Sequence, residues 1–285
     1  MKSLRWAVSL SDTMNSAKFE EVFRRATLCA LEEDVEQQRK YTYRQDSLTC
    51  LISRIIMRKA ASEYLSIPWS KVEFYRTEKG KPYLKNEGYK YQFNVSHQGD
   101  FVVLATDHCY PIGVDVMKID ENRSETAVEH ISKLKRQFTD EESIMMKGQP
   151  DELRRWQAFY RVWCLKEAIL KATGIGLTDN LRKYDFQVNS SDAHRPGCFI
   201  TSTKYVHERV EQTNWVIEES YINNDHCVAV AIEHPTPHPP SPPTQFFEIL
   251  TLDSLLNTAT FLNISPDFDD IDEYQLFVDK KNKPF

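Results

Sequence analysis

The chain has 285 residues and a formal net charge of -6 at pH 7, with 41% apolar and 12% aromatic residues. This composition supports a packed core, and the length allows two modest domains or one duplicated unit. The acidic balance argues against a general nucleic-acid binder, and the chain has no apolar run near the twenty residues that a membrane span needs.

Helices and strands are expected in two successive blocks. In the first block, we expect helices over residues 20–31 and 48–65, then strands over 72–77, 91–95 and 101–106. In the second block, we expect helices over residues 127–136 and 151–172, then strands over 184–188, 198–205, 216–221 and 226–232. This order predicts an α+β fold with a recurring helix-then-strands unit, although no residue-level repeat accompanies it.

The chain changes character at its proline-rich segment, residues 234–244. Prolines exclude a helix or central strand there and favour an extended linker. A ligand for SH3 or WW domains is the alternative, and a plain spacer is the favoured interpretation. Residues 245–250 are expected to form a strand that packs back onto the body. We therefore divide the chain into an N-terminal half (1–112), a C-terminal half (113–233), the linker (234–244) and a C-terminal extension (245–285).

The six cysteines are scattered, with neither a CxxC pair nor a His-rich metal spacing. This pattern is typical of buried, reduced thiols. The N-terminus has no charged-then-apolar leader. These two features predict a cytoplasmic protein.

The helix expected over residues 151–172 carries an acid on its apolar face. Aromatic residues at positions 156, 159, 160 and 163 recur at helical spacing, and Glu167 falls on the same stripe. A desolvated carboxylate needs a cation, a metal or a hydrogen-bond donor. Lys171, one turn later, is the nearest candidate. A structural salt bridge and a functional acid are equally compatible with this segment alone.

Two further motifs place polar residues in strands or turns. The run Asn94-Val95-Ser96-His97 precedes a polar turn, so we expect Ser96 and His97 at a hairpin tip, free to meet a ligand. A turn pair satisfied by its own backbone is the alternative.

The strand pattern at residues 112–117 sends Val114 and Val116 to one face and Gly113, Asp115 and Met117 to the other. Asp115 is therefore an acid on a strand beside a residue without a side chain. An edge charge is the alternative interpretation.

A basic loop lies between the first two expected strands. Arg76, Lys79 and Lys81 surround Gly80, whose lack of a side chain lets a phosphate approach the backbone. A solvated basic loop is the alternative.

The ordered set of NVSH, GVD and WCLKEAILKA resembles the signature of the 4'-phosphopantetheinyl transferases of the surfactin-synthetase type. RTEKGKP, GVDVMK and FYRVW extend the resemblance to the animal members of that family, from about residue 5 to residue 247. The resemblance implies Mg2+-dependent transfer of 4'-phosphopantetheine from coenzyme A, the co-substrate, to a serine of an apo acyl or peptidyl carrier protein. Adenosine 3',5'-bisphosphate would be released. It also implies two similar α/β halves in one chain, with the active site in the cleft between them.

The resemblance also implies roles for individual residues. Asp115 and Glu167 would ligate Mg2+, with water where bacterial relatives carry a third acid and this chain has Met117. Asp115, Glu167 and Lys171 would be catalytic, Glu167 ranking ahead of Lys171 as the base. Coenzyme A would contact Arg39, Arg76, Thr77, Glu78, Lys79, Gly80, Lys81, Asn94, Val95, Ser96, His97, Asp115, Glu167 and Lys171.

One position departs from the family. The arginine of the animal members falls on Gln37 in an ungapped alignment. Arg39, Lys40 or Arg44 would then have to supply the missing cation.

Partners follow from the same resemblance. Apo acyl carrier protein, or carrier domains such as those of fatty acid synthase and aminoadipate-semialdehyde dehydrogenase-like enzymes, would be the acceptors, with no nucleic acid or membrane involved. The basic residues Lys133, Lys135 and Arg136, with Phe138 as an apolar anchor, are a candidate docking patch, and a solvated helix face is the alternative. A chain with both halves can form the cleft alone, so we expect a monomer.

Two other functions use the same residues. A metal-dependent pyrophosphate hydrolase would cleave coenzyme A with water and need no acceptor protein. An inert protein that binds coenzyme A or carriers would keep the fold without the chemistry, although the intact set of Asp115, Glu167 and Lys171 argues against it.

Overall fold

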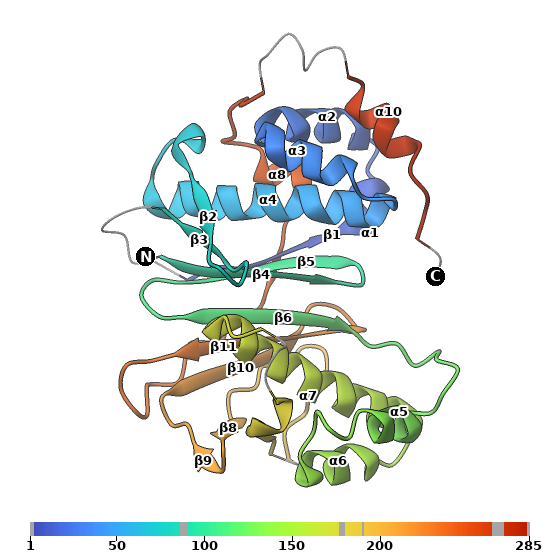
Figure 1. Ribbon diagram of the computed structural model, residues 1–285, viewed down its shortest axis with the longest axis vertical. Coiled ribbons are helices and arrows are strands. Elements are labelled where there is room, and N and C mark those ends of the chain that lie inside the picture. The colour runs from blue at the N-terminus through green and yellow to red at the C-terminus, as the bar shows by residue number, and fades with distance from the viewer. Residues whose placement is uncertain (1–2, 86–90, 177–179, 190, 264–270, 284–285) are drawn as a thin grey trace.

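A computed structural model describes residues 3–85, 91–176, 180–189, 191–263 and 271–283 of the chain. Two sheets lie face to face, and helices cover the outer face of each (Figure 1). The strand order is β12-β1-β5-β4 in the N-terminal sheet and β10-β11-β6 in the C-terminal sheet. The fold is α+β, as predicted.

The strands have the following bounds. The N-terminal sheet contains β1 (Arg5–Ser9), β4 (Gln92–Gln98), β5 (Phe101–Asp107) and β12 (Glu248–Ile249). The C-terminal sheet contains β6 (Ile112–Lys118), β10 (Trp215–Tyr221) and β11 (His226–Glu233). Two small sheets pair β2 (Phe74–Arg76) with β3 (Pro82–Leu84), and β8 (Lys204–His207) with β7 (Tyr184–Gln187) and β9 (Val210–Glu211). Strand β1 was not predicted, because all five of its residues are buried and it shows no alternation.

The helices form two groups. Above the N-terminal sheet lie α1 (Leu10–Met14), α2 (Phe19–Cys29), α3 (Glu32–Arg39), α4 (Arg44–Leu65), η1 (Trp69–Lys71), α8 (Leu252–Leu255) and α10 (Glu273–Val278). Below the C-terminal sheet lie α5 (Ala127–Lys133), α6 (Asp140–Lys147), α7 (Glu152–Thr173) and η2 (Leu181–Lys183). Capping boxes at Thr126 and Thr139 start α5 and α6, and Gly174, at a φ of 69°, ends α7. In the described part of the chain, no helix has the length and apolar character needed to cross a bilayer.

Three apolar clusters hold these layers together. One lies between α2, α4 and the N-terminal sheet, the second between α7 and the C-terminal sheet, and the third between the two sheets. The inner face of β6 contributes Val114 and Val116 to the third cluster. Each such fully buried aliphatic side chain stabilises the fold by roughly 1.5–3 kcal/mol.

Helix α7 lies directly against the opposite face of β6. A Cβ atom at Gly113 would sit 2.0 Å from the carbonyl oxygen of Ala168 and 2.3 Å from the amide nitrogen of Ala172. Any residue other than glycine would therefore push α7 away. The predicted alternation of β6 is confirmed, because Asp115 also faces α7 and bonds Lys171 there.

The expected hairpin tip is wrong. Strand β4 continues to Gln98, and Ser96 and His97 pair with Val103 and Val102 inside the sheet. The turn consists of the next two residues, where Gly99 supplies a φ of 61°. The polar run thus belongs to the strand, with Ser96 buried and His97 exposed.

Side chains connect the two sheets where β4 and β6 run side by side. The Asn94 side-chain oxygen accepts a hydrogen bond from the Val114 amide at 3.0 Å. At the far side of the layer, the guanidinium of Arg5 forms a buried ion pair with Glu218 at 2.9 Å. These contacts fix the C-terminal sheet relative to the N-terminal sheet, through β6 on one side and β10 on the other.

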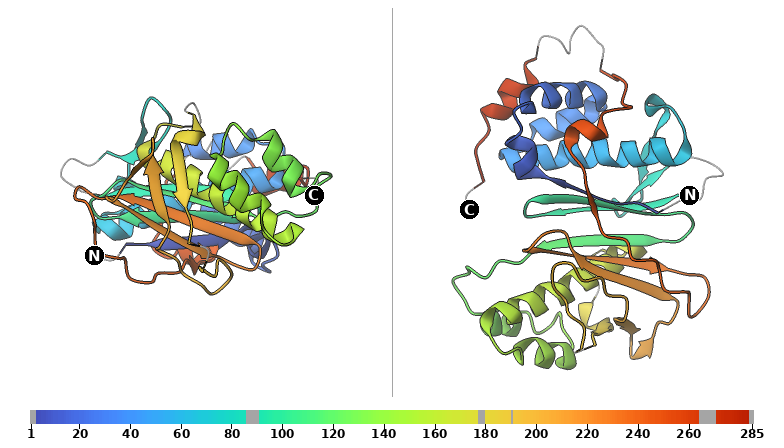
Figure 2. Two further views of the ribbon diagram at one scale, coloured as in Figure 1. Left: turned by 90° about the horizontal axis from the view of Figure 1, so that it is seen from below. Right: turned by 180° about the vertical axis from the view of Figure 1, so that it is seen from behind.

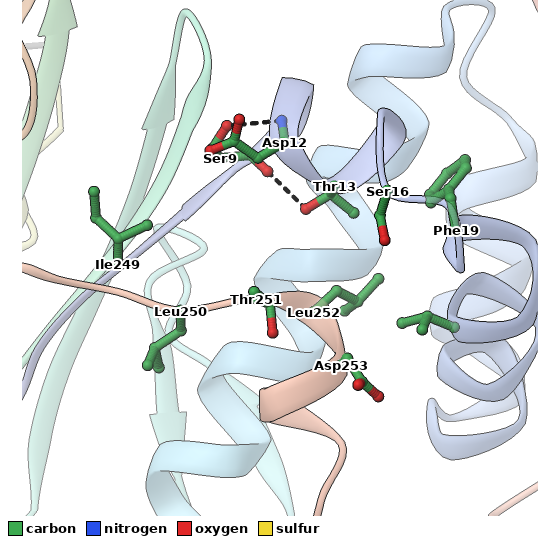
Figure 3. A pocket seen from close by; sticks show the side chains of 11 residues that line it. Ser9, Asp12, Thr13, Ser16, Phe19, Ile249, Leu250, Thr251, Leu252 and Asp253 are labelled. Atoms are coloured by element: carbon green, nitrogen blue, oxygen red, sulfur yellow. Dashed lines mark hydrogen bonds between the residues drawn. The ribbon is translucent and has the colours of Figure 1, made fainter.

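The C-terminal extension returns to the N-terminal half. Strand β12 pairs in parallel with β1, so the expectation that residues 245–250 pack back is confirmed, although only two of them form the strand. The segment that follows forms one wall of a hollow of about 170 Å³ (Figure 3). Ser9, Thr13 and Phe19 line the opposite wall.

Candidate active site

Three polar side chains, one each from β4, β6 and α7, are in contact at the junction of these elements. Asp115 on β6 is 4% exposed, and its Oδ1 accepts hydrogen bonds from Lys171 Nζ at 2.6 Å and from Ser96 Oγ at 2.9 Å. Lys171 also donates to Ser96 Oγ at 2.6 Å. Because Ser96 comes from β4 and the other two from β6 and α7, both halves of the chain contribute to this cluster.

Glu167 lies one helical turn before Lys171 and is half-buried. Its expected ion pair with Lys171 is not formed. Because α7 lies close to β6, the Lys171 ammonium pairs with Asp115 instead. Burial raises the pKa of Glu167, the negative charge of Asp115 raises it further, and Lys171 offsets only part of this. Glu167 is therefore an acid near a second acid, without a compensating contact among the described residues.

The second carboxylate oxygen of Asp115 indicates that the site can accept a cation. Asp115 Oδ2 is buried and has no hydrogen-bond partner within the described residues. Buried polar atoms are normally satisfied, so an orphan beside a second carboxylate fits a hard cation with oxygen ligands. Asp115 and Glu167 are the residues that could hold it. The described residues contain no group of three or more His, Cys, Asp or Glu side chains that could hold a metal, so the other ligands would come from substrate and water.

The basic loop reaches the same place from the N-terminal half. Gly80 adopts a φ of 83°, and its amide donates to Thr77 O at 2.8 Å. Lys81 Nζ donates to the Ala172 carbonyl at 2.8 Å, which places it at the C-terminal end of α7, next to Lys171. Burial lowers the pKa of Lys81 to about 8.

Comparisons with known proteins decide the family. Residues 17–109 match the family model described as "4'-phosphopantetheinyl transferase, N-terminal", and residues 111–231 match the "4'-phosphopantetheinyl transferase superfamily". The chain belongs to the 4'-phosphopantetheinyl transferase superfamily. The resemblance seen in the sequence is thereby confirmed.

Curated members of this superfamily are similar over most of the chain. The L-aminoadipate-semialdehyde dehydrogenase-phosphopantetheinyl transferase of Xenopus laevis is 32% identical over 295 residues, covering 100% of this chain and 95% of the relative. The Homo sapiens protein of the same name is 32% identical, with 91% and 87% covered. The 4'-phosphopantetheinyl transferase Sfp of Bacillus subtilis is 27% identical, with 59% and 74% covered.

In this transferase, Arg76 also lines a polar groove of about 470 Å³. Two arginines of α4, Arg54 and Arg58, line it too, and the sequence analysis missed both. Arg58 is buried and donates to the Trp69 and Val72 carbonyls, whereas Arg54 pairs with Asp34 at 3.1 Å. Burial raises the pKa of Asp34 more than Arg54 lowers it. The sequence signal was the i,i+4 arginine pair on a helix that otherwise reads as core.

The position that departs from the transferase family lies in this groove. Gln37 lines it beside Arg54 and Arg76. Arg39, two residues later on α3, points elsewhere and forms an ion pair with the buried Glu273 of α10. Arg44 does not reach the groove either, because its side chain donates to the carbonyls of Lys280 and Val278. Lys40, the third candidate, is exposed and its Nζ donates to Gln37 Oε1 at 3.5 Å. The structure thus places Lys40 and Arg54, rather than Arg39 or Arg44, next to Gln37.

The other predicted contact residues are placed as follows. His97 is largely exposed beside the cluster. Partial desolvation there, followed by the charge of Lys171, lowers its pKa. Thr77, Glu78 and Lys79 are exposed in the β2–β3 loop. Val95 packs into the N-terminal core, and Asn94 is buried at the seam between the sheets, so its side chain positions β6.

Substituting Glu167 tests how much the ionised side chain destabilises the fold. The pKa of Glu167 is higher in the folded than in the unfolded state. Ionisation of this side chain therefore destabilises the fold at pH values above the unfolded-state pKa of about 4.3, and this destabilisation disappears below that pH. Without metal, we expect Glu167→Gln to raise the free energy of unfolding at pH 7.5 by about 1 kcal/mol, with the gain lost near pH 4. Urea denaturation in EDTA measures this, with the exposed Glu121→Gln as a control that should change nothing. A less stable Glu167→Gln at pH 7.5 contradicts it.

Proposed function

We propose that this chain transfers 4'-phosphopantetheine from coenzyme A to a serine of an apo acyl or peptidyl carrier protein in a Mg2+-dependent reaction. The serine oxygen attacks the phosphorus that carries pantetheine, the bond to the nucleotide phosphate breaks, and adenosine 3',5'-bisphosphate leaves. The observation that carries the proposal is the orphaned Asp115 Oδ2 beside Glu167, within reach of the lysine and serine cluster.

The residues of the cluster divide the work. Asp115 and Glu167 would hold Mg2+, which supplies positive charge to the pyrophosphate when bound. Lys171 and Lys81 would bind phosphate oxygens and stabilise the charge that develops on them. Glu167 would accept the serine proton, directly or through water, on the oxygen that the metal leaves free. Lys171 is the rival for that role.

The proposed architecture follows from the same cluster. We infer that the two halves are duplicated units, and that coenzyme A binds in the cleft between them. Two helices of equal length, α4 and α7, each lying on its own sheet, support the duplication. A site completed within one chain supports a monomer, and six unpaired thiols suit a reducing, cytoplasmic location.

Intact-mass spectrometry of an apo acyl carrier protein tests the transfer. We expect incubation with this protein, coenzyme A and Mg2+ to add one phosphopantetheine to the carrier, and neither EDTA nor Glu167→Ala samples to show the addition. Carrier domains of a fatty acid synthase and of an aminoadipate-semialdehyde dehydrogenase-like enzyme serve as further acceptors. Cleavage of coenzyme A without modification of any carrier would instead establish the hydrolase, and intact coenzyme A would favour an inert binder.

The polar groove would hold the nucleotide end of coenzyme A. Arg54 and Arg76 are its two arginines with solvent access, and Arg54 would replace the cation that Gln37 cannot supply. We expect Arg54→Ala and Arg76→Ala to raise the KM for coenzyme A about tenfold, and to change the KM for 3'-dephospho-coenzyme A less, because a guanidinium is worth most opposite a phosphate. Steady-state kinetics with both donors measures this, with exposed Arg195→Ala as the control. Equal effects on both donors would place the arginines away from the 3'-phosphate.

The docking surface for the carrier lies on the C-terminal half. Lys133, Lys135 and Arg136 are exposed at the end of α5, with Ile144 of α6 also exposed. Phe138 does not belong to this surface, because it is fully buried against Phe159 and Trp163. The predicted aromatic anchor is therefore wrong, and Ile144, 72% exposed, is the apolar residue that could take its place.

Charge reversal tests the docking surface. We expect the triple change of Lys133, Lys135 and Arg136 to Glu to raise the KM for an acidic carrier about tenfold and leave coenzyme A binding unchanged. Carrier titrations and calorimetry with coenzyme A measure the two quantities. The matched control reverses three exposed cations elsewhere on the same half, Arg195, Lys204 and Arg209. If the control raises the carrier KM equally, net charge rather than this surface guides docking.

A further inference from the structure

The proline-rich segment is held against the body rather than free. Its amide at His238 donates to the Thr213 carbonyl at 2.7 Å, and the Gln245 side chain donates to the Ser3 carbonyl at 2.7 Å. The ring of Phe246 contacts Phe199, with centroids 5.8 Å apart. We call residues 239–245, which follow the anchor at His238 and end at the anchor Gln245, the proline strap. It joins the C-terminal half to the N-terminal half across the face seen in the right-hand view of Figure 2.

Exposure along the proline strap repeats every three residues. Pro239, Pro242 and Gln245 are half-buried, whereas Pro240 and Pro243 are exposed. Four prolines fix φ near -65°, and residues that precede a proline favour extended ψ values. A period of three with these dihedrals is the pattern of a polyproline II helix.

One side of this helix is used by the protein itself. Pro239 and Pro242 line a hollow together with the aromatic side chains of Tyr205 and Trp215. The other side continues into solvent as a ridge of Pro240, Pro243 and Phe246, the last 44% exposed. Residues 235–247 contain no Lys, Arg, Asp or Glu, so this ridge is apolar and uncharged.

A spacer between two anchors does not require an exposed apolar ridge, whereas a binding site does. We propose that the ridge Pro240–Pro243–Phe246 is a docking surface for a protein module whose aromatic-lined groove accepts a polyproline II helix. Such modules bind prolines spaced three apart, and affinity rises when the helix is already formed. The anchors at His238 and Gln245 supply that pre-organisation, so little conformational entropy is lost on binding. The absence of charge favours a groove without an acidic specificity pocket, as in WW domains.

NMR titration tests the proposal with the full-length protein. An isotope-labelled WW domain is titrated with unlabelled protein, and the shifts of its groove residues give the dissociation constant. An SH3 domain is the comparison. The ridge variant is Pro240→Ala/Pro243→Ala. The matched control is Pro235→Ala/Pro237→Ala, which removes two exposed prolines outside the proline strap. Urea denaturation confirms that both variants fold, and this readout does not depend on the proposed transferase activity.

We expect the wild type and the control to shift the groove residues of the WW domain with dissociation constants within about twofold of each other, and the ridge variant to bind about tenfold more weakly. Stronger binding by the SH3 domain than by the WW domain would overturn the choice of an uncharged groove. An unshifted groove in both domains, or equal binding by the ridge variant, would overturn the docking surface and leave the strap a spacer.

Discussion

The close contact between α7 and β6 is the constraint on which the candidate site depends. A side chain at Gly113 would collide with the α7 backbone, since its Cβ would lie 2.0 Å from Ala168 O. Only at this separation does Lys171 reach Asp115 at 2.6 Å and leave Glu167 facing the same carboxylate. A shift of about 1 Å would weaken the alignment on which catalysis depends.

The charges of the site are incomplete in the protein alone. Asp115 Oδ2 is buried without a partner among the described residues, Glu167 is partly desolvated beside it, and Lys81 is a half-buried ammonium whose pKa is lowered by desolvation. Each of these groups is less stable than it would be in water. A cation and a polyphosphate arriving together would relieve all three, so binding energy is available where the chemistry takes place.

The framework around the site is braced from the outside by the C-terminal extension. Arg39 and Arg44 point away from the polar groove. They contact α10 and the segment after it instead. The C-terminal extension thereby fixes the loop between α3 and α4 and the first turn of α4. Arg54 lies further along the same helix. The buried Arg5–Glu218 pair and the Asn94–Val114 bond hold the two sheets in one arrangement, because breaking either would leave a buried polar group unsatisfied.

Local pattern determined much of this protein. The 3.6-residue period identified α4 and α7, the two-residue period placed Asp115 opposite Val114, and the ordered motifs indicated the family. Only the tertiary structure decided that Lys171 pairs with Asp115 rather than Glu167, that Ser96 lies inside a strand, that Phe138 is core and that Arg54 stands beside Gln37. Periodicity reports which face of an element is buried, whereas the partner of a charge depends on how closely distant elements approach, which no short stretch of sequence encodes.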